Sequence, residues 1–211
     1  MQLAAWGALL MQRYGVVCRE VVSFAAPGLN WPELADWLEA AEWRGEVRRG
    51  YFVEGLSGVQ YTTDDTANGL LLYCDRLGAE QGGMEPSIHL ISAIDPANVY
   101  GASAPLDLPL IDGGRTRLPR VSGNSIVLVN GRPVWIIQER GQRLTSLPHA
   151  SQSLRQQSLR HLVRNFTGTS TKWTITMLDN APPVTTEWAE TLGQLGFVND
   201  GLSMTMYKGL V

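Results

Sequence analysis

Six basic side chains lie in a stretch of the sequence that holds no carboxylate. Between residues 140 and 178 there is neither Asp nor Glu. Guanidinium groups bind phosphate oxygens in bidentate geometry, and such contacts need no particular base sequence. The stretch therefore predicts a surface for a polyanion such as nucleic acid, made by Arg140, Arg143, Arg155, Arg160, Arg164 and Lys172.

The best-defined part of this surface is one side of a predicted helix over residues 151–166. The helical period places Gln157, Arg160 and Arg164 on the side opposite the apolar residues. We therefore expect this side to contact nucleic acid. A second interpretation stays open, in which the same side packs against an acidic domain.

A smaller basic cluster is formed by Arg44, Arg48 and Arg49, at the base of a predicted β-ribbon. These side chains could hold phosphates, and they could equally form ion pairs within their own domain. The helix before the ribbon would repel DNA phosphates, so we expect it to dock on protein rather than to enter a groove. Its carboxylates are Glu33, Asp36, Glu39 and Glu42.

Three residues could serve the excision of a base. Glu54, Gln60 and Asp95 carry a carboxylate or an amide that could position water or stabilise an oxocarbenium-like sugar beside a flipped base. Each lies in a segment rich in glycine or turn residues, which explains its presence without catalysis. A DNA glycosylase therefore remains the alternative function.

The sequence predicts no metal site. His89, His149 and His161 have no partner at ligand spacing, and Cys18 and Cys74 lie far apart. Two separated cysteines are typical of a reducing, cytoplasmic setting.

Three tryptophans recur at a spacing of six residues, which puts them on different sides of a helix. Trp37 is expected in the core. Trp31 or Trp43 could stack on a base, but burial is the expectation for both.

The first part of the chain has the element order of a winged helix, three helices and then a β-ribbon. The helices are expected over residues 3–14, over residues 16–22 and between Asn30 and Gly45. The strands are expected over residues 46–53 and 59–62, and a further helix over 64–77.

The glycines and the proline of residues 78–86 predict a boundary, with a winged-helix domain over 1–82 and a second domain over 83–211. The fold class is α+β, and the second domain is expected to be a small antiparallel, barrel-like sheet with packed helices. Its clearest feature is a hairpin turning at Asn130-Gly131, because both residues tolerate positive φ. Its other expected elements are strands over 88–94, 172–178 and 204–207, helices over 151–166 and 186–195, and a long loop over 101–124.

Charge is divided unevenly between the two halves. The chain carries a net charge of −3, but residues 1–100 hold thirteen acidic against six basic residues and residues 101–211 hold seven against eleven. This asymmetry is typical of a protein with a polyanionic partner. No apolar run is long enough to predict a membrane span, and the first residues do not resemble a signal peptide.

Four segments resemble one family beyond the generic winged helix. They are RYGVVCRE over residues 13–20, GEVRRGYFVEGLSGVQY over 45–61, IDPANVYG over 94–101 and LGQLGF over 192–197. Together they resemble the region that follows the motor in large helicase-related (Lhr-type) DNA helicases.

The resemblance implies an accessory, non-motor region that binds single-stranded DNA or a DNA:RNA hybrid and contacts the helicase motor domains. It also implies that ATP and Mg²⁺ belong to that motor, because this sequence has no G-x-x-x-x-G-K-[ST] loop. We therefore expect no cofactor and no ATP hydrolysis by this chain, which would be a part of a longer protein or the end of a split or truncated gene. The glycosylase alternative gains from fold similarity to an alkylpurine DNA glycosylase family and from Lhr C-terminal regions linked to uracil removal.

Overall fold

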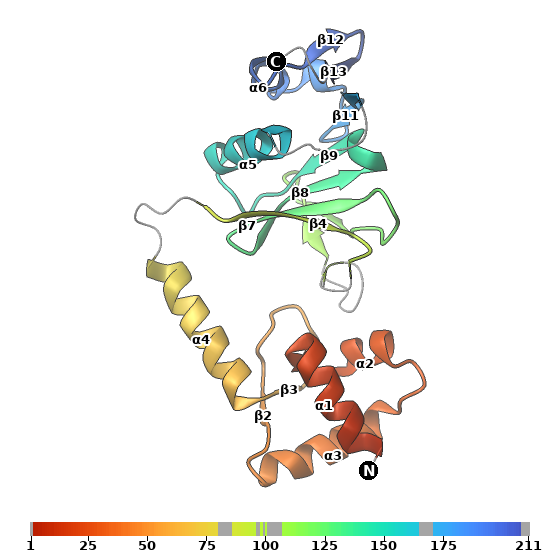
Figure 1. The fold of residues 1–211 in the computed structure, drawn as a ribbon, viewed down its shortest axis with the longest axis vertical. Coiled ribbons are helices and arrows are strands. Elements are labelled where there is room, and N and C mark those ends of the chain that lie inside the picture. The colour runs from red at the N-terminus through yellow and green to blue at the C-terminus, as the bar shows by residue number, and fades with distance from the viewer. Residues whose placement is uncertain are drawn as a thin grey trace. The chain divides into compact units, whose positions relative to one another are not determined.

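The chain folds into two compact units in a computed structural model that describes residues 2–79, 86–95, 98, 100, 107–164 and 171–207 (Figure 1). The first unit lies within residues 1–84 and also contains Tyr100, and the second contains the described residues from 86 to 98 and from 107 onward. None of the described helices is both long and apolar enough to cross a bilayer.

The first unit is a winged helix, as the sequence predicts. A small antiparallel sheet, ordered β1-β3-β2, joins the helices to the wing. Its elements are α1 (Gln2–Tyr14), β1 (Val16–Val17), α2 (Arg19–Ala25), α3 (Trp31–Trp43), β2 (Arg48–Gly50), β3 (Gln60–Thr62) and α4 (Asp64–Ala79).

The core of the first unit follows the helical period. Leu34 and Leu38 of α3 are fully buried, and they pack with Leu10 of α1 and Tyr61 of β3. The expected helix over residues 16–22 was wrong in its first part, because Val16 and Val17 pair with Thr62 and Tyr61 as a strand. The helix α2 begins only after that strand, at Arg19.

Gln60 fastens the wing to its base. Its Oε1 accepts hydrogen bonds from the backbone N–H groups of Phe52, at 2.9 Å, and Val53, at 2.8 Å. Its Nε2 donates to the Val53 carbonyl at 2.9 Å. The side chain is fully buried, so water cannot replace these bonds without a rearrangement of the wing.

The second unit is built on an open five-stranded sheet ordered β11-β9-β8-β7-β4. All neighbours are antiparallel except β11, which runs parallel to β9. Because β11 and β4 are the two edges among the described residues, the expected barrel is not closed. The strands are β4 (Ile88–Ser92), β7 (Ser125–Val129), β8 (Arg132–Gln138), β9 (Arg143–Ser146) and β11 (Met177–Leu178).

A second antiparallel sheet, ordered β10-β13-β12, completes this unit together with two helices and a short hairpin. The hairpin lies inside residues 101–124, where the sequence predicted only a loop, and residues 101–106 lie outside the described part. These elements are β5 (Leu108–Pro109), β6 (Arg115–Thr116), α5 (Gln152–Arg164), β10 (Lys172–Ile175), α6 (Ala189–Gln194), β12 (Val198–Asp200) and β13 (Ser203–Tyr207).

The predicted hairpin at Asn130-Gly131 is confirmed, with φ values of 49° and 75°. The single strand expected over 172–178 was wrong, because its first half is β10 and its second half is β11, in different sheets.

Trp135 of β8 links the five-stranded sheet to α5, since its buried indole Nε1 donates to Ser158 Oγ of that helix at 3.0 Å.

We predict that Gln60→Ala destabilises the first unit by about 1 to 3 kcal/mol, because two backbone donors and one acceptor lose their partner. Urea denaturation followed by tryptophan fluorescence measures the change. The control is Gln12→Ala, which removes an amide from the exposed side of α1. Equal stability of the two variants would show that the wing does not depend on Gln60.

Candidate nucleic-acid interface

The second unit carries a basic hollow beside the C-terminal half of α5. The hollow has a volume of about 280 Å³ and is lined by Pro86, Ile88, Gln157, Arg160, His161 and Arg164. We call it the α5 hollow. Gln157, Arg160 and Arg164, which the sequence placed on one side of this helix, therefore lie together beside Ile88 at the start of β4.

The packing of α5 explains why these residues face outward. Leu159 and Leu162 are buried in the core, and α5 contacts β4 and β7 (Figure 1). Residues 157, 160 and 164 fall on the other side of the helix and are exposed. The cation Arg164 is also favourable in the last turn of α5, where the backbone dipole is negative.

Arg160 and Arg164 form no ion pair with any residue that the structure describes. Five ion pairs exist in that part of the chain, and neither arginine takes part in them. The cause is local, because residues 140–178 offer no carboxylate. Within the described part of the chain, the hollow therefore presents two positive charges without an ion-pair partner beside the Gln157 amide, which is a donor set suited to phosphate oxygens.

Arg132 lies at the same end of the sheet as the hollow, which the sequence analysis missed. Ile88 pairs with Val129 and Val129 with Arg132, so the three residues share one face of the sheet. Arg132 is exposed and has no ion pair within the described residues. The Asn130-Gly131 turn fixes the pairing of Val129 with Arg132, but only the fold brings Ile88 beside them.

The other residues of the carboxylate-free stretch do not join the hollow. Arg143 pairs with Gln138 of β8 and Met177 of β11, at the far end of the strands and toward the opposite edge of the sheet. Arg140 lies in the short connection just before β9, at that same far end. The structure thus places Arg140 and Arg143 at a separate corner of the second unit.

Arg155 and Lys172 are also set apart from the hollow. Arg155 is half-buried, and its Nε and Nη1 lie below the surface without a hydrogen-bond partner among the described residues. Its backbone carbonyl accepts from the Trp135 indole at 3.3 Å, which places it on the core side of α5. Lys172 is exposed at the start of β10, in the other sheet.

The three arginines at the base of the wing are all paired. The paired groups lie on α3, on the α3–β2 connection and at the start of α4, so the positive charge of the wing base is compensated within the first unit. Such exposed pairs are weak, but they lower the attraction for phosphate. The pairs are Arg44–Glu46 at 2.7 Å, Arg48–Asp64 at 2.5 Å, Arg49–Glu39 at 3.2 Å and Arg49–Glu42 at 3.0 Å.

The expectation that Trp43 is buried was wrong. Its side chain is 85% exposed at the end of α3, while Trp31 and Trp37 are half-buried. Tyr51, after β2, is 84% exposed and carried no signal in the sequence analysis. The wing side of the first unit therefore displays two large aromatic rings.

The three residues considered for base excision do not share one unit of the structure. Glu54 is exposed in the wing, and Gln60 is buried with its amide used on Phe52 and Val53. Asp95 belongs to the second unit.

The backbone around Asp95 is held by hydrogen bonds of its own. Arg120 Nη2 donates to the carbonyls of Ile94, at 3.3 Å, and Asp95, at 3.4 Å, and buried Asn98 donates to the Ser92 carbonyl at 3.0 Å. The described residues contain no group of His, Cys, Asp and Glu that could hold a metal ion.

Glu20 anchors the tip of the wing. Its carboxylate accepts hydrogen bonds from the Ser57 hydroxyl and from the Ser57 backbone N–H, the latter at 3.1 Å. Burial alone would raise the pKa of Glu20, but the hydrogen bonds from Ser57, from the Glu20 backbone N–H and from the Cys18 thiol together outweigh it and lower this pKa below its ordinary value of 4.5.

These features define a winged-helix domain joined to an α+β domain. Residues 1–81 match the family described as "Large helicase-related protein, winged-helix domain". The resemblance found in the sequence is thereby confirmed: residues 1–81 match this winged-helix family, and the chain is similar to Lhr-type helicases.

Two curated relatives support this assignment. "Lhr helicase/ probable uracil glycosylase" of Mycolicibacterium smegmatis is 35% identical over 140 residues, which are 65% of this chain and 9% of the relative. "Lhr helicase/uracil glycosylase" of Escherichia coli is 29% identical over 137 residues, 63% of this chain and 8% of the relative. The chain therefore spans less than a tenth of the length of the relatives that it matches.

We predict that Glu20→Gln removes a pH-dependent part of the stability of the first unit. A lowered pKa in the folded state stabilises the fold above pH 4.5, and this stabilisation is lost as the pH falls through the folded-state pKa. Wild type should exceed the variant in stability at pH 7, and the difference should shrink below pH 4.5. Thermal unfolding between pH 3 and 7 measures it, with Glu54→Gln on the same wing as the control. A difference that does not change with pH would contradict the role of the ionised carboxylate.

Proposed function

We propose that the chain is an accessory nucleic-acid-binding and interdomain-docking module of an Lhr-type DNA-repair helicase, acting in the cytoplasm. It contacts the single strand behind the ATP-driven motor, as single-stranded DNA or as the DNA strand of a DNA:RNA hybrid. ATP and Mg²⁺ belong to the motor domains, because this sequence carries no phosphate-binding loop. The chain by itself neither binds these cofactors nor catalyses a reaction.

The observation that carries this proposal is the uncompensated charge of the α5 hollow. Arg160 and Arg164 have no ion pair within the described residues, whereas the arginines of the wing base are all paired. A phosphate bound at the hollow gains charge-assisted hydrogen bonds without first breaking an ion pair. Arg132 extends the same positive surface along the sheet.

A single strand fits these features better than a duplex read by the winged helix. The α3 helix, which would enter a major groove, carries four carboxylates, and among the described residues only Glu39 and Glu42 are in ion pairs, both with the single guanidinium of Arg49. The remaining negative charge would repel the phosphates that line a groove. We infer that α3 faces protein, with the motor domains of the helicase as its partner.

The alternative function is excision of uracil or of an alkylated base. It is favoured by the names of both relatives, which include a uracil glycosylase. Of the candidates, Asp95 is the residue to test, because the amide of Gln60 is already used by the wing. Under this alternative the chain alone would produce abasic sites in a uracil-containing oligonucleotide, and Asp95→Asn would abolish them. Under our proposal no abasic sites appear.

We predict that Arg160→Ala combined with Arg164→Ala weakens binding of an oligothymidylate and flattens its salt dependence. Each lost phosphate contact should reduce the log–log slope by about 0.7, so the double variant should lose roughly 1.4. Fluorescence anisotropy between 50 and 300 mM salt measures both quantities. The matched control is Arg48→Ala with Arg49→Ala, which removes two paired arginines. Equal effects in the two double variants would refute the α5 hollow as the binding surface.

A further inference from the structure

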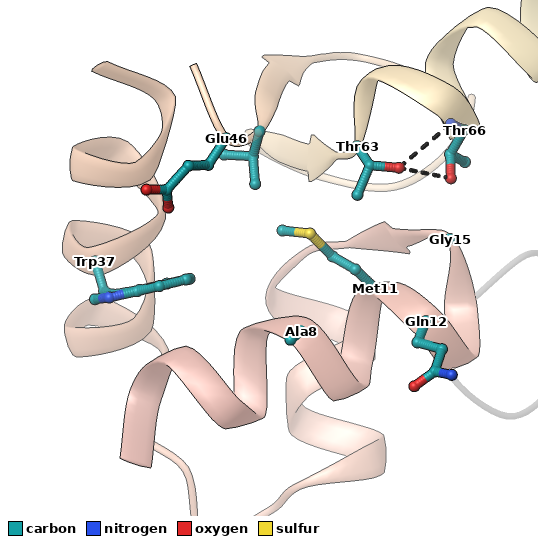
Figure 2. A pocket seen from close by; sticks show the side chains of 9 residues that line it. Ala8, Met11, Gln12, Gly15, Trp37, Glu46, Thr63 and Thr66 are labelled. Carbon is teal, nitrogen blue, oxygen red and sulfur yellow. Dashed lines mark hydrogen bonds between the residues drawn. The ribbon is translucent and has the colours of Figure 1, made fainter. Parts of the chain in front are cut away.

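The first unit contains a pocket that none of the preceding roles uses. It has a volume of about 480 Å³ and lies between α1, α3 and the start of α4 (Figure 2). We call it the Trp37 pocket. It is lined by Ala8, Met11, Gln12, Gly15, Trp37, Glu46, Val47, Thr63 and Thr66.

One wall of the pocket is the indole ring of Trp37, which Gly7 of α1 and the Arg44 guanidinium both approach. The ring reaches from α3 toward Met11 of α1, as Figure 2 shows. A Cβ on Gly7 would come within 2.7 Å of the ring, so a larger residue at position 7 would require the indole or α1 to shift. The Arg44 guanidinium lies over the ring at 5.9 Å from its centroid. The indole thus offers a fixed aromatic surface, half of it buried.

The other walls provide hydrogen-bonding groups. Thr63 and Thr66 lie across the pocket from Trp37, with their hydroxyls 3.0 Å apart (Figure 2). The Glu46 carboxylate accepts from Arg44 at 2.7 and 3.0 Å. Each of its oxygens keeps a second lone pair for another donor. The pocket therefore combines a flat apolar wall with a carboxylate that can accept hydrogen bonds.

We propose that the Trp37 pocket binds an unpaired nucleobase that carries an exocyclic amino group. The base packs on the indole, and its amino group donates to Glu46, which is the pairing that carboxylates make with cytosine N4. The Arg44–Glu46 ion pair presents no net positive charge to a phosphate, so the pocket takes the base rather than the backbone. This proposal rests on the proposed function in one respect, because the unpaired base would come from the single strand that the chain is proposed to bind.

Cytidine and uridine form a suitable pair of probes, because they carry no phosphate and differ only at ring positions 3 and 4, where cytidine has an acceptor nitrogen and an amino group and uridine has an N–H and a carbonyl. Saturation-transfer NMR on the full chain should show cytidine binding about tenfold more tightly than uridine, since only cytidine presents an amino group to Glu46. Glu46→Ala should remove this preference. Ala8→Phe should abolish cytidine binding, because Ala8 lines the pocket from the exposed side of α1. Ala5→Phe, the same change on an exposed position of α1 outside the pocket, should leave binding intact.

The outcomes separate this proposal from the proposed function. Cytidine binding that survives Ala8→Phe, an equal affinity for uridine, or no saturable binding of cytidine overturns the pocket. The salt dependence of oligothymidylate binding should not change in Ala8→Phe. Loss of strand binding with intact cytidine binding would overturn the α5 hollow and leave the Trp37 pocket standing.

Discussion

Whether an arginine of this protein can bind a phosphate depends on whether a carboxylate lies close enough to form an ion pair with it. In the first unit, Arg44, Arg48 and Arg49 meet acidic groups from α3, from its following turn and from α4. Arg160 and Arg164 of α5 have no such partner among the described residues, and the nearly forty consecutive residues around them lack Asp and Glu. Each exposed pair contributes little stability. Local pairing nevertheless decides which positive charges are left for a phosphate, and this constraint separates the wing base from the α5 hollow.

The regular elements could be predicted where they depend on neighbours in the sequence. The helices α1, α3 and α5 follow from apolar periodicity, and the hairpin at Asn130-Gly131 follows from its turn. Elements that depend on distant partners could not. Val16 and Val17 become a strand because Tyr61 and Thr62 pair with them, and residues 172–178 divide between two sheets because Tyr207 and Leu144 lie beside different parts. No local pattern contains this information.

The candidate site shows the same limit. Helical spacing was sufficient to join Gln157, Arg160 and Arg164, which line one hollow. Arg143 lies close to these residues in the sequence and was predicted to share their surface. The strand register instead places it at the opposite corner of the sheet. The burial of Trp43 was predicted wrongly, because residue type favours the core and spacing alone does not reveal which side of α3 lacks a neighbour. Tertiary pairing decides each of these cases.

A single strand differs from a duplex in exposing its phosphates and its base edges at the same time. Each unit suits one of these two groups. In the second unit the α5 hollow offers arginines without an ion pair among the described residues, which suit phosphates, and in the first unit the Trp37 pocket offers an aromatic wall and a carboxylate, which suit a base. A carboxylate is unfavourable beside phosphate and favourable beside an amino group. The negative charge of the first unit is therefore compatible with nucleic-acid binding, provided that this unit contacts bases while the second holds the backbone.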